Sequence, residues 1–120
     1  MSRILAIEDS PTLLGLLAKC LQGGGHEVVT ATNGEEGLAQ LRRHRPEMVV
    51  TDLNMPVMNG LDFVEAARGL REGRGVPIVL LTTETAPELM ARARFVKATG
   101  WLQKPLDGPR LLGLIAEMCD

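Results

Sequence analysis

The sequence predicts an α/β fold in which the five strands of a parallel sheet alternate with five helices. Short apolar runs recur along the chain, and segments with leucine or alanine at helical intervals follow them. This alternation requires right-handed crossovers, which cover both faces of the sheet with helices. The central runs agree, because they are hydrophobic without interruption, as in strands buried on both faces. The apolar runs are residues 3–7, 27–31, 48–52, 77–82 and 100–103.

Turn and capping residues mark the boundaries of these elements. Three glycines at 23–25 end the helix after the first run, and the motif NGEEG at 33–37 opens the helix after the second. Pro46 precedes the third run, and the stretch 73–77 leads into the fourth. The apolar helical positions include Leu13, Leu16, Leu17 and Leu21; Leu38 and Leu41; Phe63, Val64 and Ala67; and Leu111, Leu114, Ile115 and Met118.

Length and composition are those of one packed domain, residues 1–120. Hydrophobic residues make up 45% and charged residues 23%, which excludes a disordered chain. A net charge of −2 without a basic run excludes direct nucleic-acid binding. No apolar stretch approaches the ~20 residues of a membrane span, and the first residues do not form a signal peptide, so we expect a cytoplasmic protein. Cys20 and Cys119 are expected to pack as small hydrophobic residues.

Polar side chains follow four of the predicted strands at their carboxyl ends. Glu8 and Asp9 follow the first strand and Asp52 ends the third. Thr82 ends the fourth, and Lys104 follows the fifth. Ligands of open parallel sheets gather at this edge, near the point where the winding direction reverses. We therefore expect these five side chains to converge.

Three carboxylates at one edge repel one another unless a divalent cation lies among them. Mg²⁺ fits best, because it takes oxygen ligands and typically uses one or two carboxylates together with phosphate oxygens. Each residue also has a simpler interpretation. Glu8 and Asp9 suit a helix N-terminus, Asp52 a turn, Thr82 a strand and Lys104 a solvated end. Taken together, the convergence favours the metal site.

Four motifs occur in order at these strand ends: IEDS, DLNMPVMNG, LLTTE and KP. In that order and at these separations they resemble the receiver domain of two-component response regulators, of the CheY-like single-domain type, and the resemblance covers essentially the entire chain. It implies a doubly wound, flavodoxin-like sheet of strand order 2-1-3-4-5. It also implies a signalling switch that is no conventional turnover enzyme.

The resemblance assigns a role to each residue at the strand ends. It implies that Asp52 accepts a phosphoryl group from a histidine of a sensor kinase or phosphotransfer protein. Glu8, Asp9, Asp52 and the backbone carbonyl of Asn54 would hold Mg²⁺. Thr82 and Lys104 would bind phosphoryl oxygens, and the bond from Lys104 to its proline is usually cis in the family.

The resemblance further implies a switch in which Thr82 moves toward the phosphoryl group and Trp101 turns inward. The fourth helix, fifth strand and fifth helix, roughly residues 86–119, would then contact a downstream protein, and the chain would be a monomer or weak dimer. Asn54, Thr83 and Glu84 match positions that tune autodephosphorylation. The basic residues of the fourth helix are expected to be a solvated face; they are Arg92, Arg94 and Lys97.

Several alternatives remain open at this point. A magnesium-dependent phosphatase of the haloacid dehalogenase kind also forms an aspartyl phosphate, but its D-x-D pattern after the first strand is missing from EDSPT. A flavin or nucleotide module on the same fold conflicts with acids at the phosphate position. The chain is also compatible with a receiver that works by protein contact alone, or with one cut from a larger regulator or hybrid kinase.

Overall fold

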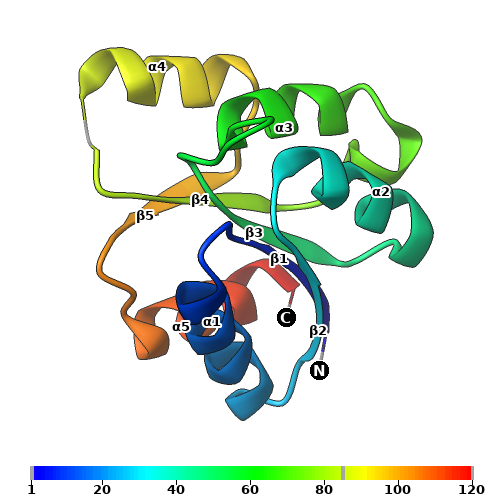
Figure 1. The fold of residues 1–120 in the computed structure, drawn as a ribbon, viewed down its shortest axis with the longest axis vertical. Coiled ribbons are helices and arrows are strands. Elements are labelled where there is room, and N and C mark those ends of the chain that lie inside the picture. Colours follow the sequence, from blue (N-terminus) through cyan, green and yellow to red (C-terminus); the bar gives the residue numbers. More distant parts are fainter. Residues whose placement is uncertain (1, 85, 120) are drawn as a thin grey trace.

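A computed structural model describes residues 2–84 and 86–119 of the chain. Its five strands form one parallel sheet in the order β2-β1-β3-β4-β5 (Figure 1), which confirms the expected architecture. The order reverses direction between β1 and β3, and the strand ends that meet there position the candidate site. The strands are β1 Arg3–Ile7, β2 Glu27–Ala31, β3 Met48–Asp52, β4 Ile78–Thr82 and β5 Gly100–Gln103.

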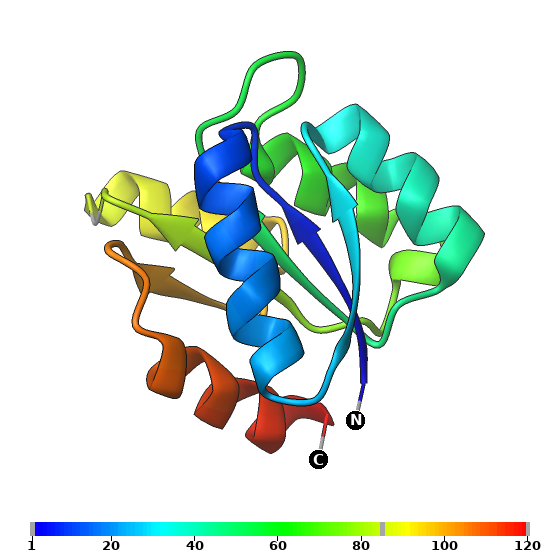
Figure 2. The same ribbon diagram turned by 60° about the horizontal axis from the view of Figure 1, so that its bottom comes forward.

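Helices cover both faces of this sheet. α1 and α5 lie on one face, and α2, α3 and α4 lie on the other (Figures 1 and 2). Each face has its own core cluster of buried, mostly aliphatic residues, and the larger cluster contains Phe63, the largest fully buried side chain described. The helices are α1 Pro11–Gly23, α2 Gly34–His44, α3 Gly60–Arg68, α4 Pro87–Phe95 and α5 Gly108–Cys119.

The strands confirm the apolar runs of the sequence almost residue for residue. β3 and β4 are buried along their whole length, as expected for central strands covered on both faces. The expected fourth strand included Pro77, whereas β4 begins at Ile78, and a short 3-10 turn over Arg71–Gly73 precedes it. Pro77 lies outside the strand and still accepts a hydrogen bond from the backbone of Val49 through its carbonyl.

α1 differs from its sequence pattern. Of its four leucines at helical spacing, Leu17 and Leu21 are buried, whereas Leu13 and Leu16 are 44% and 56% exposed. These four positions could share one apolar face, but α1 is rotated so that Leu17 and Leu21 face the sheet with Leu14 partly buried beside them, which leaves Leu13 and Leu16 at the margin of that face. Cys20 packs at the edge of the same core cluster, as expected for a small hydrophobic residue.

Three helices, α1, α2 and α3, begin with a short polar side chain at the N-cap position. The side chains of Ser10, Asn33 and Asn59 each accept a hydrogen bond from the third residue of the following helix. Among the described residues, no helix is long and apolar enough to cross a membrane.

Gly60, the first residue of α3, packs against the backbone of the third strand end. A Cβ atom there would lie 2.5 Å from the carbonyl oxygen of Asp52 and 3.0 Å from the Cα of Leu53. We expect Gly60→Ala to lower the unfolding free energy by about 1–3 kcal/mol, because neither backbone atom can give way easily. Urea unfolding measures the effect. Gly113→Ala in α5 is the matched control, since its Cβ meets nothing within 4 Å and the substitution should stabilise the chain. Equal effects at both positions would contradict the packing argument.

Candidate functional site

The five polar residues predicted from the strand ends lie together at the carboxyl edge of the sheet. Glu8 follows β1, Asp52 ends β3 and Thr82 ends β4, and all three are almost completely buried, with exposed fractions of 3%, 5% and 1%. Asp9 is exposed beside them, and Lys104 directly follows β5. The fold thus brings together residues that are up to 96 positions apart in sequence.

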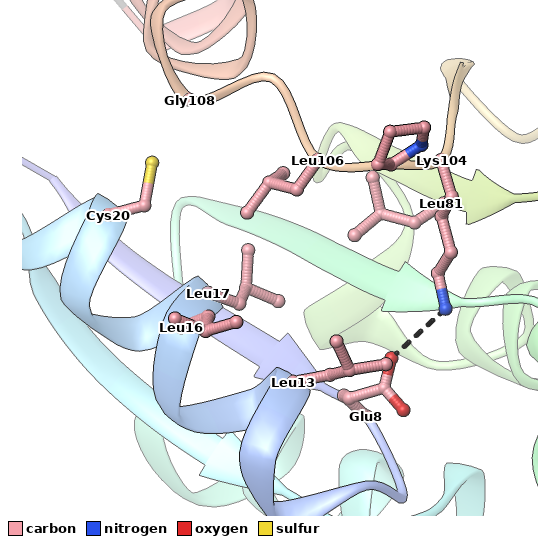
Figure 3. A pocket seen from close by; sticks show the side chains of 10 residues that line it. Glu8, Leu13, Leu16, Leu17, Cys20, Leu81, Lys104, Leu106 and Gly108 are labelled. Carbon is pink, nitrogen blue, oxygen red and sulfur yellow. Dashed lines mark hydrogen bonds and ion pairs between the residues drawn. The ribbon is translucent and has the colours of Figure 1, made fainter.

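Lys104 forms ion pairs with two of the acids. Its Nζ lies 2.8 Å from Oδ1 of Asp52 and 3.3 Å from Oε1 of Glu8; Figure 3 shows the second contact. The backbone of Lys104 is also fixed, because its N–H donates to the carbonyl of Thr82 at 2.8 Å. The Lys104–Pro105 peptide bond is cis, as the resemblance implied.

The site holds more negative than positive charge. Burial raises the pKa of Glu8, with further increases from Asp9 and Asp52; a hydrogen bond from the backbone of Ser10 and the charge of Lys104 oppose this rise. Burial tends to lower the pKa of Lys104, but its contacts with Asp52 and Glu8 outweigh it, so that pKa is raised. Lys104 therefore stays protonated, and one ammonium faces three carboxyl groups.

The acids are close enough to share one cation. Carboxylate oxygens of Glu8, Asp9 and Asp52 lie within 4.8 Å of one another. A set made only of carboxylate oxygens suits a hard cation such as Mg²⁺ and gives it room to keep water ligands. The donor set therefore fits the metal that the sequence predicts.

A hydrogen bond joins the two loops that leave β3 and β4. Nδ2 of Asn54, in the loop after β3, donates to Oε1 of Glu84, in the loop after β4, at 3.0 Å. The Thr82 hydroxyl accepts from the backbone N–H of Glu84 at 2.9 Å and lies 3.2 Å from its carbonyl. Thr83 is exposed between them. The sequence paired Asn54 with Glu84 by position but gave no signal that they touch.

Comparison with known proteins decides the family. The sequence-family model of the response regulator receiver domain matches residues 4–116 of this chain. The chain belongs to this family. The receiver is 33% identical to the protein PilH of Pseudomonas aeruginosa over 115 residues, which cover 96% of this chain and 95% of PilH. Its fold superimposes on the chemotaxis protein CheY4 of Vibrio cholerae with a TM-score of 0.94 at 40% identity, covering 98% of both chains.

A longer regulator is also similar to this receiver. The DNA-binding response regulator MtrA of Mycolicibacterium smegmatis is 41% identical over 113 residues, which are 94% of this chain and 48% of MtrA. The chain thus spans about half the length of that relative. Receiver domains are signalling switches under phosphorylation control, so the matches do not favour a phosphatase of the haloacid dehalogenase kind.

Trp101 of the receiver is half-buried on β5 and packs against the core cluster beneath α2, α3 and α4. The guanidinium carbon of Arg94 lies 5.5 Å from the centroid of its ring. Arg94 was expected to be solvated with its basic neighbours; it is exposed, but it also covers an aromatic face. The contact was invisible in the sequence, because the two residues lie on different elements.

An apolar groove of about 440 Å³ extends from the site along α1 (Figure 3). Glu8 and Lys104 stand at one end, and Cys20 and Gly108 stand at the other. The walls come from α1, from β4 and from the loop after β5; they include Leu13, Leu16, Leu17, Leu81, Pro105 and Leu106. This groove was not predicted from the sequence. Its signal was that α1 carries more leucines than one buried face requires.

Proposed function

We propose that this receiver accepts a phosphoryl group on Asp52 from a histidine of a sensor kinase or phosphotransfer protein, in a reaction that requires Mg²⁺. The observation that carries the proposal is the contact of the Lys104 ammonium with Asp52 at 2.8 Å, inside a cluster with Glu8 and Asp9. A buried carboxylate beside a fixed cation and a set of metal-binding acids is what transfer to an acidic residue requires.

In the proposed reaction, a carboxylate oxygen of Asp52 bonds to phosphorus as the phosphorus–nitrogen bond of phosphohistidine breaks. The electron pair of that bond remains on the imidazole, which takes up a proton. Lys104, already held at the carboxylate, is placed to bind an equatorial phosphoryl oxygen. Glu8, Asp9, Asp52 and the backbone carbonyl of Asn54 would hold Mg²⁺, which supplies further positive charge to the phosphoryl oxygens.

The conformational response would start at Thr82. Its hydroxyl is bonded to the Glu84 backbone, and a phosphoryl oxygen on Asp52 offers a stronger, charged acceptor. Movement of Thr82 toward that oxygen would leave space on the side of Trp101. We propose that Trp101 then turns inward and changes the face formed by α4, β5 and α5, which contacts a downstream protein.

The groove beside the site suits the phosphodonor protein. Leu13, Leu16 and Leu106 are exposed around it, although exposed apolar side chains gathered in one place are uncommon on a free surface. A donor helix with apolar residues near its histidine would cover them and bring the phosphoryl group to Asp52. Residues 1–120 would act in this way as one receiver unit, alone or within a longer regulator.

The test is to expose the chain to a small acyl phosphate in the presence and absence of Mg²⁺. We expect the intact mass to increase by one phosphoryl group only with Mg²⁺, and the fluorescence of Trp101, the sole tryptophan, to change with it. A chain that gains no mass, or gains it equally in chelator, contradicts the proposal. Sustained hydrolysis of generic phosphate esters would favour a phosphatase.

Dephosphorylation is expected to depend on Asn54. In the proposed reaction a water oxygen attacks phosphorus, restores the carboxylate and releases phosphate. Asn54 and Glu84 are hydrogen-bonded between the loops that follow Asp52 and Thr82, where they would position that water. We expect Asn54→Ala to lose phosphate roughly five-fold more slowly, the rate equivalent of one hydrogen bond of about 1 kcal/mol. Phosphate release after removal of the donor measures the rate, with Asn33→Ser, which keeps a cap on α2, as the control. Equal rates would remove Asn54 from this step.

A further inference from the structure

We infer that Arg94 is a latch on Trp101: its guanidinium stabilises the present position of the indole ring and thereby biases the receiver against its phosphorylated conformation. This inference rests on the proposed movement of Trp101. It adds a positioning residue on α4 that acts through the ring without touching the phosphoryl group.

The contact has the geometry of a cation–π interaction. The Arg94 guanidinium carbon lies 5.5 Å from the centre of the Trp101 ring, within the range over which the ring face attracts a cation. Tryptophan gives the strongest such contact among the aromatic residues, and guanidinium is the cation found most often. Among residues 2–84 and 86–119, no carboxylate forms an ion pair with Arg94, so no acid competes with the ring for its charge.

The sheet register connects Trp101 to the proposed phosphorylation site. Trp101 pairs with Leu80, and Thr82 pairs with Gln103, two residues further along both strands. Side chains two positions apart on a strand share a face, so Thr82 and Trp101 are diagonal neighbours on the face covered by α4. Trp101 therefore adjoins the responding hydroxyl within the sheet and contacts Arg94 on the helix above it.

α4 has few other means of attachment. Its described buried residues are Met90 and Ala93, Leu89 and the C-cap Val96 also pack on the core, and Ala86 at its N-terminus offers no capping side chain. In both ribbon views α4 lies at the end of the sheet where β5 forms the edge (Figures 1 and 2). The contact between Arg94 and Trp101 adds a direct side-chain link between α4 and β5.

A contact made in only one conformation shifts the equilibrium by its own free energy. If the ring turns inward, it moves away from the guanidinium, and the contact is lost. Exposed cation–π contacts correspond to roughly a two- to five-fold change in an equilibrium constant. Removing the guanidinium should therefore favour the switched conformation by about that factor.

The experiment titrates the full chain with beryllofluoride in excess Mg²⁺, with binding followed by fluorine NMR and the ring position by Trp101 fluorescence. We expect Arg94→Met to lower the half-saturating concentration roughly two- to five-fold, and Arg94→Lys, which keeps a cation, to lie nearer the wild type. Arg92→Met is the matched control. Arg92 is an exposed arginine of the same helix that is not stacked on the ring, so this variant removes the same charge without touching the contact.

Urea unfolding separates a latch from a contact that is merely structural. A latch predicts that Arg94→Met destabilises the free receiver but not the receiver saturated with beryllofluoride. An equal loss in both forms, an unchanged half-saturation, or an equal shift in Arg92→Met overturns the latch. If the wild type binds beryllofluoride with no change at Trp101, the latch fails and Asp52 remains the proposed acceptor. If it binds none, the proposed function fails as well.

Discussion

Asp52→Asn is expected to abolish phosphorylation of the receiver. The amide oxygen that replaces the carboxylate is a poor nucleophile, and the ion pair with Lys104 at 2.8 Å is lost at the same time. The loss should be complete within the sensitivity of intact-mass measurement after exposure to an acyl phosphate and Mg²⁺. The fluorescence change at Trp101 should disappear with it, because the proposed switch follows from the phosphoryl group.

Asp62→Asn is the matched control for this variant. Asp62 is an exposed aspartate in the first turn of α3, ten positions along the chain and outside the acidic cluster. We expect it to gain one phosphoryl group at the wild-type rate. If Asp52→Asn still gains the mass, the acceptor lies elsewhere and the proposal is wrong. Peptide mapping of the wild type would then identify it.

Asp9→Asn is expected to weaken Mg²⁺ binding by at least about tenfold. Asp9 is the exposed member of the acidic cluster, so an amide can replace its carboxylate without disturbing the core. A Mg²⁺ titration followed by Trp101 fluorescence or calorimetry measures the affinity. Asp107→Asn is the control, because it changes an exposed aspartate in the loop before α5. Wild-type affinity in Asp9→Asn would exclude this cluster as the metal site.

The same substitution should change how stability depends on pH in chelator. Burial, aided by Asp9 and Asp52, raises the pKa of Glu8 above its ordinary value of 4.5. Between its unfolded and folded pKa values the native state binds more protons, so the unfolding free energy falls as pH rises through this window. Asp9→Asn removes one cause of the raised pKa and should make that fall smaller. Urea midpoints between roughly pH 4 and pH 7 measure it; parallel curves for both proteins would contradict the prediction.

The two surfaces of the proposed switch do not coincide. The groove of Leu13, Leu16 and Leu106 lies between α1 and the loop after β5, whereas Arg94 and Trp101 lie on the side of α4. A donor protein seated in the groove would therefore leave the Trp101 side open. This separation would let the receiver pass its signal on after it has taken the phosphoryl group.

Local pattern was sufficient to predict the strands, the end of the first helix, the start of the second and the polar residues at the strand ends. The strand that ends at Asp52, for example, is buried along its whole length, and the sequence shows this as an uninterrupted apolar run of a few neighbouring residues. Parallel strands share one edge for their carboxyl ends, so the meeting of Glu8, Asp52 and Lys104 also followed from topology alone.

Tertiary structure decided what no local pattern contains. Which leucines of α1 are buried depends on how the helix is rotated against the sheet, and the groove follows from that rotation. The contacts of Arg94 with Trp101 and of Asn54 with Glu84 join side chains on separate elements. Flexible polar side chains can adopt many rotamers, so the partner that each one meets is known only once the fold has placed the two elements side by side. Periodicity determines which face of an element is apolar; packing in three dimensions determines which neighbour each side chain meets.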